Sequence, residues 1–178
     1  MTLEEQKYPI GRFVKPEKIS EIGLKNFISE IRTLPDRLRK EVDTLSDNQL
    51  NTTYRDGGWT LRQVVNHCAD SHMNGFIRIK LALTEDRPTI KPYQEERWAQ
   101  LQDTSSIPVS AALKTLDGLH ERWTILLESL TRDQLQRTYI HPADETERRV
   151  DETIATYAWH GNHHLAHITS LKKQKGWK

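Results

Sequence analysis

The sequence predicts an all-α protein, a four-helix bundle with a long crossover and a short β-hairpin before the last helix. Four segments place apolar residues mostly three or four positions apart, which is the spacing of helices that bury one face. Prolines interrupt the stretch from Glu85 to Pro108, so the second and third helices are not expected to be simple hairpin neighbours. At 178 residues the chain fits one domain, residues 1–178.

The first half of the chain predicts an arm and two long helices. Residues 1–15 hold turn-forming and aromatic residues and predict an arm that packs across the outside of the domain or a neighbour, rather than a helix start. The first helix covers about 16–45, and Pro35 is expected to kink it or split it in two. The second helix covers about 60–83, with Thr60 as its N-cap.

The second half predicts the crossover, two more helices and a hairpin. One short helix is expected at about 94–101 within the crossover. The third helix starts near Ser106 or at the turn 108–110 and extends through Leu130. Residues 137–150 indicate a short hairpin, after which Asp151 is expected to cap a final helix that ends near Lys175.

A faint internal repeat relates the two halves. Residues 45–54 and 130–139 share leucine, hydroxyl, glutamine, threonine and tyrosine positions in register. Each copy precedes a loop or hairpin, a capped helix and a histidine, which is His67 in the first half and His160 in the second. If a pseudo-twofold axis relates the halves, these histidines lie at the same level of the bundle and can converge.

Composition excludes several classes of partner. The formal net charge is +1, so the basic surplus typical of nucleic-acid binding is missing, and no nucleic-acid partner is expected. The single cysteine, Cys68, excludes an internal disulfide and lies within an apolar stripe, which favours core packing over a nucleophile or ligand. No apolar run is long enough for a membrane span and no signal peptide is evident, so we expect a soluble, cytoplasmic protein with no membrane partner.

A run of histidines in the last helix is the strongest functional signal. Four of the eight histidines fall within residues 160–167. His160 and His164 lie one helical turn apart, as do His163 and His167, so either pair can point two imidazoles at one ion. The apolar stripe of this helix places His160 and His164 at its margin and the other two further round, toward solvent. The pair His160 and His164 is therefore preferred as metal ligands.

An open metal site needs about three protein ligands, so a third histidine is required. The candidates are His67, His72, His120 and His141. His72 lies in the centre of its apolar stripe, where a neutral core histidine is the commoner explanation. His67 ranks first because it lies on the flank of the stripe of the second helix and is supported by the repeat. Asp70, Ser71 and Asn74 share or border its face and are candidates for pocket groups.

Two motifs then carry a family resemblance. Residues 59–72, WTLRQVVNHCADSH, and residues 159–168, WHGNHHLAHI, resemble the DinB/YfiT-like superfamily of metal-binding four-helix bundles, and the similarity extends over essentially the whole chain. The resemblance implies a three-histidine site on His67, His160 and His164, a divalent zinc or nickel ion with an open coordination face, and frequently a homodimer. Members of this superfamily transfer thiols such as bacillithiol or mycothiol, isomerise, or hydrolyse.

The ligand set and the resemblance together predict a metal-dependent enzyme that acts on a small molecule. Three neutral imidazoles leave an ion its full double positive charge, which favours an anionic fourth ligand, and a thiolate is softer and more nucleophilic than hydroxide. Transfer of a low-molecular-weight thiol to an electrophile is therefore favoured. Two alternatives stay open: a metal-dependent hydrolase of a small molecule, and a metal-binding stress-response module without turnover.

Overall fold

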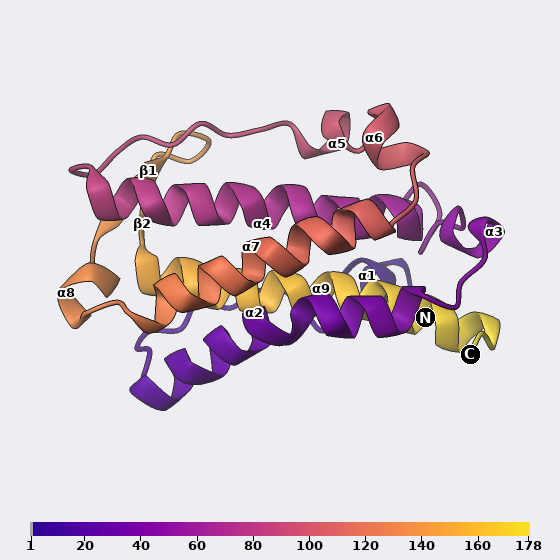
Figure 1. Ribbon diagram of the computed structural model, residues 1–178, viewed down its shortest axis with the longest axis horizontal. Helices are drawn as coiled ribbons and strands as arrows, with labels where there is room; N and C mark the ends of the chain where they lie inside the picture. Colours follow the sequence, from indigo (N-terminus) through magenta and orange to yellow (C-terminus); the bar gives the residue numbers. More distant parts are fainter. Residues whose placement is uncertain (1) are drawn as a thin grey trace.

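Four long helices lie along one another in the computed structural model, which describes residues 2–178 (Figure 1). They are α2 (Glu21–Val42), α4 (Leu61–Thr84), α7 (Ser110–Glu128) and α9 (Val150–Lys175). Helix α2 packs against α7 and α9, and α4 packs against the same two, so α2 and α4 lie diagonally across the bundle. The predicted all-α four-helix bundle is confirmed.

The crossover determines how the helices are oriented. After α4 the chain returns along the length of the bundle through α5 (Glu95–Trp98) and α6 (Gln102–Ser105), so α7 starts at the same end as α4 and runs in the same direction (Figure 1). Helices α4 and α7 are therefore neighbours without forming a hairpin, as the length of the crossover predicts. The one short helix expected there is two shorter helices.

The internal repeat corresponds to matching local structures. Helices α3 (Asp47–Leu50) and α8 (Arg132–Leu135) are each four residues long. Each begins with a capping box, formed by Ser46 with Gln49 in α3 and by Thr131 with Gln134 in α8. An isolated bridge between Thr53 and Thr60 follows the first copy, and the hairpin follows the second. In both halves this unit leads into a long helix that carries a candidate ligand, His67 on α4 and His160 on α9.

The hairpin pairs β1 (Thr138–His141) with β2 (Thr146–Arg149) in antiparallel register and leads directly into α9. The N-cap of α9 is Arg149, not Asp151 as predicted. Arg149 is still extended because it closes the strand pairing opposite Thr138. Asp151 lies in the first turn, where its carboxylate accepts a hydrogen bond from the backbone N–H of Glu152 at 2.7 Å and suits the positive end of the helix dipole.

The N-terminal arm differs from the expectation in one respect. It starts with a short helix, α1 (Leu3–Lys7), because Thr2 and Glu5 form a capping box. The rest of the arm lies across α9, where Phe13 contacts Trp159 at a ring centroid distance of 5.8 Å. The predicted packing of the arm on the outside of the domain is therefore confirmed.

Pro35 does not split α2, which is continuous through this buried position. Proline has no N–H, so the carbonyl one turn earlier, that of Ile31, lacks its usual helical donor. His120 Nδ1 on α7 lies 2.5 Å from this oxygen and supplies the hydrogen bond. The missing helical bond is thus replaced by a bond between two helices.

Two apolar clusters form the core, with a layer of histidines between them. One cluster includes Leu38, Cys68 and Ile168, and the other includes Ile79 and Trp123. Along the helices, four histidines fall between residues of the two apolar clusters: His72 on α4, His120 on α7, and His160 with His164 on α9. His67 lies on α4 between Val65 and Cys68 of the first cluster. No helix within residues 2–178 is long and apolar enough to span a membrane.

Candidate metal centre

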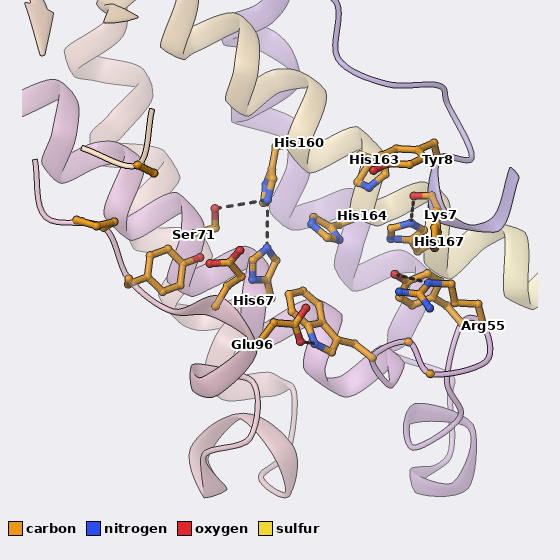
Figure 2. A pocket seen from close by; sticks show the side chains of 18 of the residues that line it. Lys7, Tyr8, Arg55, His67, Ser71, Glu96, His160, His163, His164 and His167 are labelled. Atoms are coloured by element: carbon orange, nitrogen blue, oxygen red, sulfur yellow. Dashed lines mark hydrogen bonds between the residues drawn. The ribbon is translucent and has the colours of Figure 1, made fainter. Parts of the chain in front are cut away.

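Three histidines from two helices meet at the centre of the bundle. His67 lies about two turns into α4, whereas His160 and His164 lie about three and four turns into α9. Because α4 and α9 pack together and run in opposite directions, their side chains converge, and one nitrogen of each histidine lies within 4.8 Å of the other two (Figure 2). The structure therefore brings together the three residues that the sequence selected.

The distances within this cluster fit a metal ion. His67 Nε2 and His160 Nε2 are 3.2 Å apart. Two nitrogens that each lie about 2.0–2.1 Å from a tetrahedral zinc ion are about 3.3–3.4 Å apart, which is close to the observed separation. Nδ1 of His164 is buried and has no hydrogen-bond partner within residues 2–178. Nδ1 of His163 and Nδ1 of His167 also have no hydrogen-bond partner among the described residues, so the short separation between His67 and His160 is the observation that fits a shared cation.

Burial keeps the three imidazoles neutral. Desolvation, with a smaller repulsion from His163, lowers the pKa of His67 to about 4. Desolvation lowers the pKa of both His160 and His164 well below the ordinary histidine value. At neutral pH each ring therefore offers a lone pair, which is the form that binds a divalent ion.

The second pair, His163 and His167, is buried, so the expectation that it faces solvent is wrong. His163 stacks on Trp159 at a centroid distance of 4.6 Å, and His167 stacks on Tyr54 at 4.0 Å. His167 Nε2 also donates a hydrogen bond to the backbone carbonyl of Lys7 at 3.1 Å. Helical periodicity could not show this burial because the covering residues come from the N-terminal arm and from a loop far away in the sequence.

The other candidates for a third ligand lie elsewhere. His72 is fully buried in the core, as predicted, and its Nδ1 lies 3.0 Å from Nε2 of His120. His141, on β1, lines the cavity above the cluster but is not part of it. Cys68 packs inside an apolar cluster, where burial raises the pKa of its thiol to about 12, so the prediction of a packing role is confirmed.

A cavity of about 730 Å³ opens over the cluster. Trp59 forms part of its wall and contacts the His67 ring at a centroid distance of 4.5 Å. Basic side chains also line it, and Figure 2 shows Arg55 on the side of His167. Its charged and phenolic lining includes Lys7, Arg55, Arg78, Tyr93, Glu95 and Glu96. The cavity is large enough for a small-molecule substrate.

A second cavity, of about 500 Å³, meets the first at His160. Ser71, Arg78 and His160 line both. Ser71 Oγ lies 3.4 Å from His160 Nε2, which agrees with its prediction as a pocket group. The rest of the second lining comes from the N-terminal arm, the hairpin and the start of α9, with Phe13 and Tyr139 among its residues.

Sequence reasoning missed the basic lining of the first cavity. Arg78 could have been found, because Ser71 follows His67 by four residues and Arg78 follows Ser71 by seven along α4, which keeps the three on one face. Arg55 and Tyr93 lie in a loop and in the crossover, where no periodic pattern predicts the direction of a side chain. Only the structure shows that the side chains of Arg55 and Tyr93 line the cavity.

The comparisons with known proteins agree with the fold, and several relatives carry names that refer to a metal. The model of the DinB superfamily matches residues 30–168. A protein of Bacillus cereus named "Putative metal-dependent hydrolase" is 51% identical over 175 residues, which cover 98% of this chain and 100% of the relative. A protein of Bacillus anthracis with the same name matches at the same identity and coverage.

Among solved structures, this chain is similar to YfiT from Bacillus subtilis, described as a probable metal-dependent hydrolase with an unusual four-helix bundle topology. The TM-score is 0.96 at 44% identity, over 98% of this chain and 99% of that chain. A mycothiol-dependent maleylpyruvate isomerase shares only the fold, with a TM-score of 0.60 at 13% identity over 79% of this chain and 60% of that one. The extent of the family match and the similarity of the relatives lead to one conclusion: this chain belongs to the DinB superfamily.

Proposed function

We propose that this protein is a divalent-metal-dependent enzyme that transfers a low-molecular-weight thiol of the bacillithiol type to an electrophilic small molecule. The observation that carries the proposal is the convergence of three neutral imidazoles, from His67, His160 and His164, beneath a cavity of about 730 Å³. Three protein ligands leave a position open for a further ligand. The relatives' names support the dependence on metal.

Zinc and nickel are the ions that suit this donor set, because imidazole nitrogen binds both. When bound, such an ion supplies a positive charge that lowers the pKa of a thiol or of water at the open position. His67, His160 and His164 would hold the ion, and their neutrality would leave its charge uncompensated. The Ser71 hydroxyl lies 3.4 Å from His160 Nε2 and would be close enough to orient a molecule bound beside the ion.

The basic residues of the cavity favour an anionic substrate. Among residues 2–178, none of the carboxylates forms an ion pair with Lys7, Arg55 or Arg78. All three line the first cavity, and Arg78 lines the second as well. Guanidinium groups bind carboxylates in a bidentate manner, so they can orient a thiol that carries such a group.

The reaction that we propose is a substitution. The thiol releases its proton to solvent, the sulfur electron pair forms a new S–C bond, and the bond from that carbon to the leaving group breaks. The leaving group departs with the bonding electrons as an anion. No oxidant or reductant is needed. Two cavities that meet at His160 provide room for two substrates, which favours transfer over hydrolysis.

Hydrolysis of a small molecule is the second candidate, because the similar proteins carry the name of hydrolase. It would use the same cluster, with water in place of the thiol at the open position. A metal-binding stress-response module without turnover is the third. The three functions differ in what they consume: a transferase consumes thiol, a hydrolase consumes only its substrate, and a binding module consumes neither.

The test is to incubate the zinc-loaded or nickel-loaded protein with monochlorobimane, with and without bacillithiol, and to measure the conjugate and the free hydrolysis product. We expect conjugation above the uncatalysed rate that is lost after chelation and in His164→Ala but kept in His163→Ala. Conjugation at the uncatalysed rate, together with metal-dependent hydrolysis of esters or amides, would replace the transferase by the hydrolase. The absence of both activities would favour the binding module.

We also propose that the protein is a homodimer, as the resemblance to the superfamily implies. Sedimentation equilibrium of the metal-loaded protein tests this, with an expected mass of twice the 20.8 kDa of one chain. A monomer at micromolar concentration would contradict it.

A further inference from the structure

A line of three histidines, the half-buried His160 and the buried His72 and His120, connects the cluster to a backbone carbonyl of α2. His160 Nδ1 lies 3.2 Å from His72 Nε2, and His72 Nδ1 lies 3.0 Å from His120 Nε2. His120 Nδ1 in turn lies 2.5 Å from the carbonyl oxygen of Ile31. The line therefore runs from α9 through α4 and α7 to α2 and joins all four helices of the bundle.

The carbonyl fixes the direction of every hydrogen bond in this line. A carbonyl oxygen can only accept, so Nδ1 of His120 carries a hydrogen, and Nε2 of the same neutral ring must then accept. His72 therefore donates from Nδ1 to His120 and accepts at Nε2. His160 consequently donates from Nδ1, and its Nε2 is left with a lone pair. This is the nitrogen that lies 3.2 Å from His67 Nε2, inside the cluster.

Pro35 explains why this carbonyl is available. In a regular helix the N–H of residue 35 would bond to the carbonyl of residue 31, but proline has no N–H. The Ile31 oxygen can therefore accept from His120 without competition from the donor that helical geometry would place there. The proline that disturbs the hydrogen bonding of α2 thus provides the fixed end of the histidine line.

The surroundings hold the line in one arrangement. His72 is fully buried and His120 is 1% exposed, so bulk water does not reach the two middle rings. The edge-on contacts of the His72 ring with Trp123 and Tyr157, at centroid distances of 5.7 Å and 5.2 Å, restrict its rotation. At the other end, the Ser71 hydroxyl lies 3.4 Å from His160 Nε2 and can donate to that nitrogen in the metal-free protein, which agrees with a lone pair there.

We infer that His120 and His72 are positioning residues that fix His160 in the tautomer with hydrogen on Nδ1, so that its Nε2 lone pair is directed at the metal. The inference rests on the metal site of the proposed function, though not on the reaction performed there. Histidine ligands are commonly oriented by one acceptor behind the ring, and loss of that acceptor weakens metal binding by about 10–100-fold. Here the acceptor is another histidine, and its own orientation depends on a third.

The direct test needs neither turnover nor metal. Long-range ¹H–¹⁵N correlation spectra of the metal-free wild-type protein distinguish the two tautomers of each neutral histidine. We expect the hydrogen on Nδ1 in His120, His72 and His160. Hydrogen on Nε2 of His160 would overturn the inference, whereas failure of the thiol-transfer assay would leave this result unaffected.

Variants then test whether the line matters for the metal. His120→Leu removes the acceptor of His72, so we expect a mixture of His160 tautomers and a zinc affinity about 10–100-fold weaker, measured by competition with a chelating dye. His120→Gln can keep an acceptor oxygen for His72 and should retain more of the affinity. Leu127→Ala, a buried position on the same helix but outside the line, controls for the loss of packing.

The zinc affinities of these variants also show which result would contradict the inference. Wild-type zinc affinity in His120→Leu would overturn the inference, as would an equal loss of affinity in Leu127→Ala, because the effect would then reflect packing alone. If His120→Leu does not fold, the tautomers of the wild-type protein still decide the question.

Discussion

The position of each ring nitrogen decides which histidines can share an ion. Seven of the eight histidines are buried or lie at the cluster, yet only three present nitrogens within 4.8 Å of one another among the described residues. His163 and His164 are adjacent in sequence, but the first stacks on Trp159 and the second points to His67 (Figure 2). This contrast makes His163 a control for each predicted ligand.

We predict that His67→Ala, His160→Ala and His164→Ala each release the metal, whereas His163→Ala retains it. Each of the first three removes one of the three converging nitrogens, and two imidazoles bind a divalent ion much more weakly than three. Metal content per chain after gel filtration, measured by atomic emission, checks this. Full occupancy in His67→Ala would show that the third ligand is another residue.

We predict that Cys68 is inert in the folded protein. Burial raises the pKa of its thiol to about 12, and the reactive species is the thiolate. Iodoacetamide at pH 8 should therefore leave the native protein unmodified and alkylate it after unfolding, which mass spectrometry detects. Cys68→Ser should bind the same amount of metal and lose about 1–3 kcal/mol of unfolding free energy if the hydroxyl finds no partner. Rapid alkylation of the native protein would contradict the packing role.

At the scale of elements, the site depends on how closely α4 and α9 approach each other. Gly75 of α4 faces Tyr157 of α9, and a Cβ added there would lie 2.5 Å from Cε2 of the tyrosine ring. The same ring contacts His72, so any displacement reaches the histidine layer. Glycine is required at this position for space between two helices, not for backbone conformation.

We therefore predict that Gly75→Ala lowers the unfolding free energy by about 1–3 kcal/mol, the usual effect of overpacking, and also weakens zinc binding. The control is Gly118→Ala on α7, where an added Cβ meets nothing within 4 Å among the described residues apart from the nearby backbone of its own helix. Alanine there should raise stability by about 0.5–1 kcal/mol because it favours the helix. Urea denaturation and zinc titration check both variants. If Gly75→Ala is as stable as Gly118→Ala, the close approach of α4 to α9 at Gly75 does not limit the size of the side chain.

The sequence predicted elements well where the signal was local. Thr60 is the N-cap of α4 as predicted, and it forms a capping box with Gln63. The same signal, Thr2 with Glu5, marks the start of α1, although the turn-forming residues that follow favour an irregular arm. What the sequence could not predict depends on contacts between distant segments, such as the arm that covers His163 or the strand pairing that moves the cap of α9 to Arg149.

For the whole molecule, the histidine layer is a polar plane between two apolar clusters. The buried histidines are neutral, and burial makes it unfavourable to protonate them. The stability of the fold is therefore expected to depend on pH in the acid range. Burial lowers the pKa of His67, His120, His163 and His167 to about 4 and that of His72, His160 and His164 well below the ordinary value.

The direction of the pH effect follows from linkage. In the unfolded chain these histidines have a pKa of about 6.5, so between about pH 4 and 6.5 the unfolded state binds more protons than the folded state. Acidification in this range therefore favours unfolding. The stabilisation is fully present above about pH 6.5 and is lost as the pH falls toward 4. One such histidine contributes up to about 1.4 kcal/mol per pH unit, and several act together here.

We predict that the unfolding free energy of the metal-free protein falls by more than about 1.4 kcal/mol between pH 6 and pH 5, as measured by urea denaturation. Zinc should stabilise the protein at pH 7, and this gain should shrink in acid because protons compete with the metal for the same lone pairs. His67→Ala removes one of the buried rings and should reduce both the slope and the gain. A stability that is constant between pH 6 and pH 5 would mean that the histidine layer is open to water and charged, and the neutral donor set on which the metal centre depends would then be wrong.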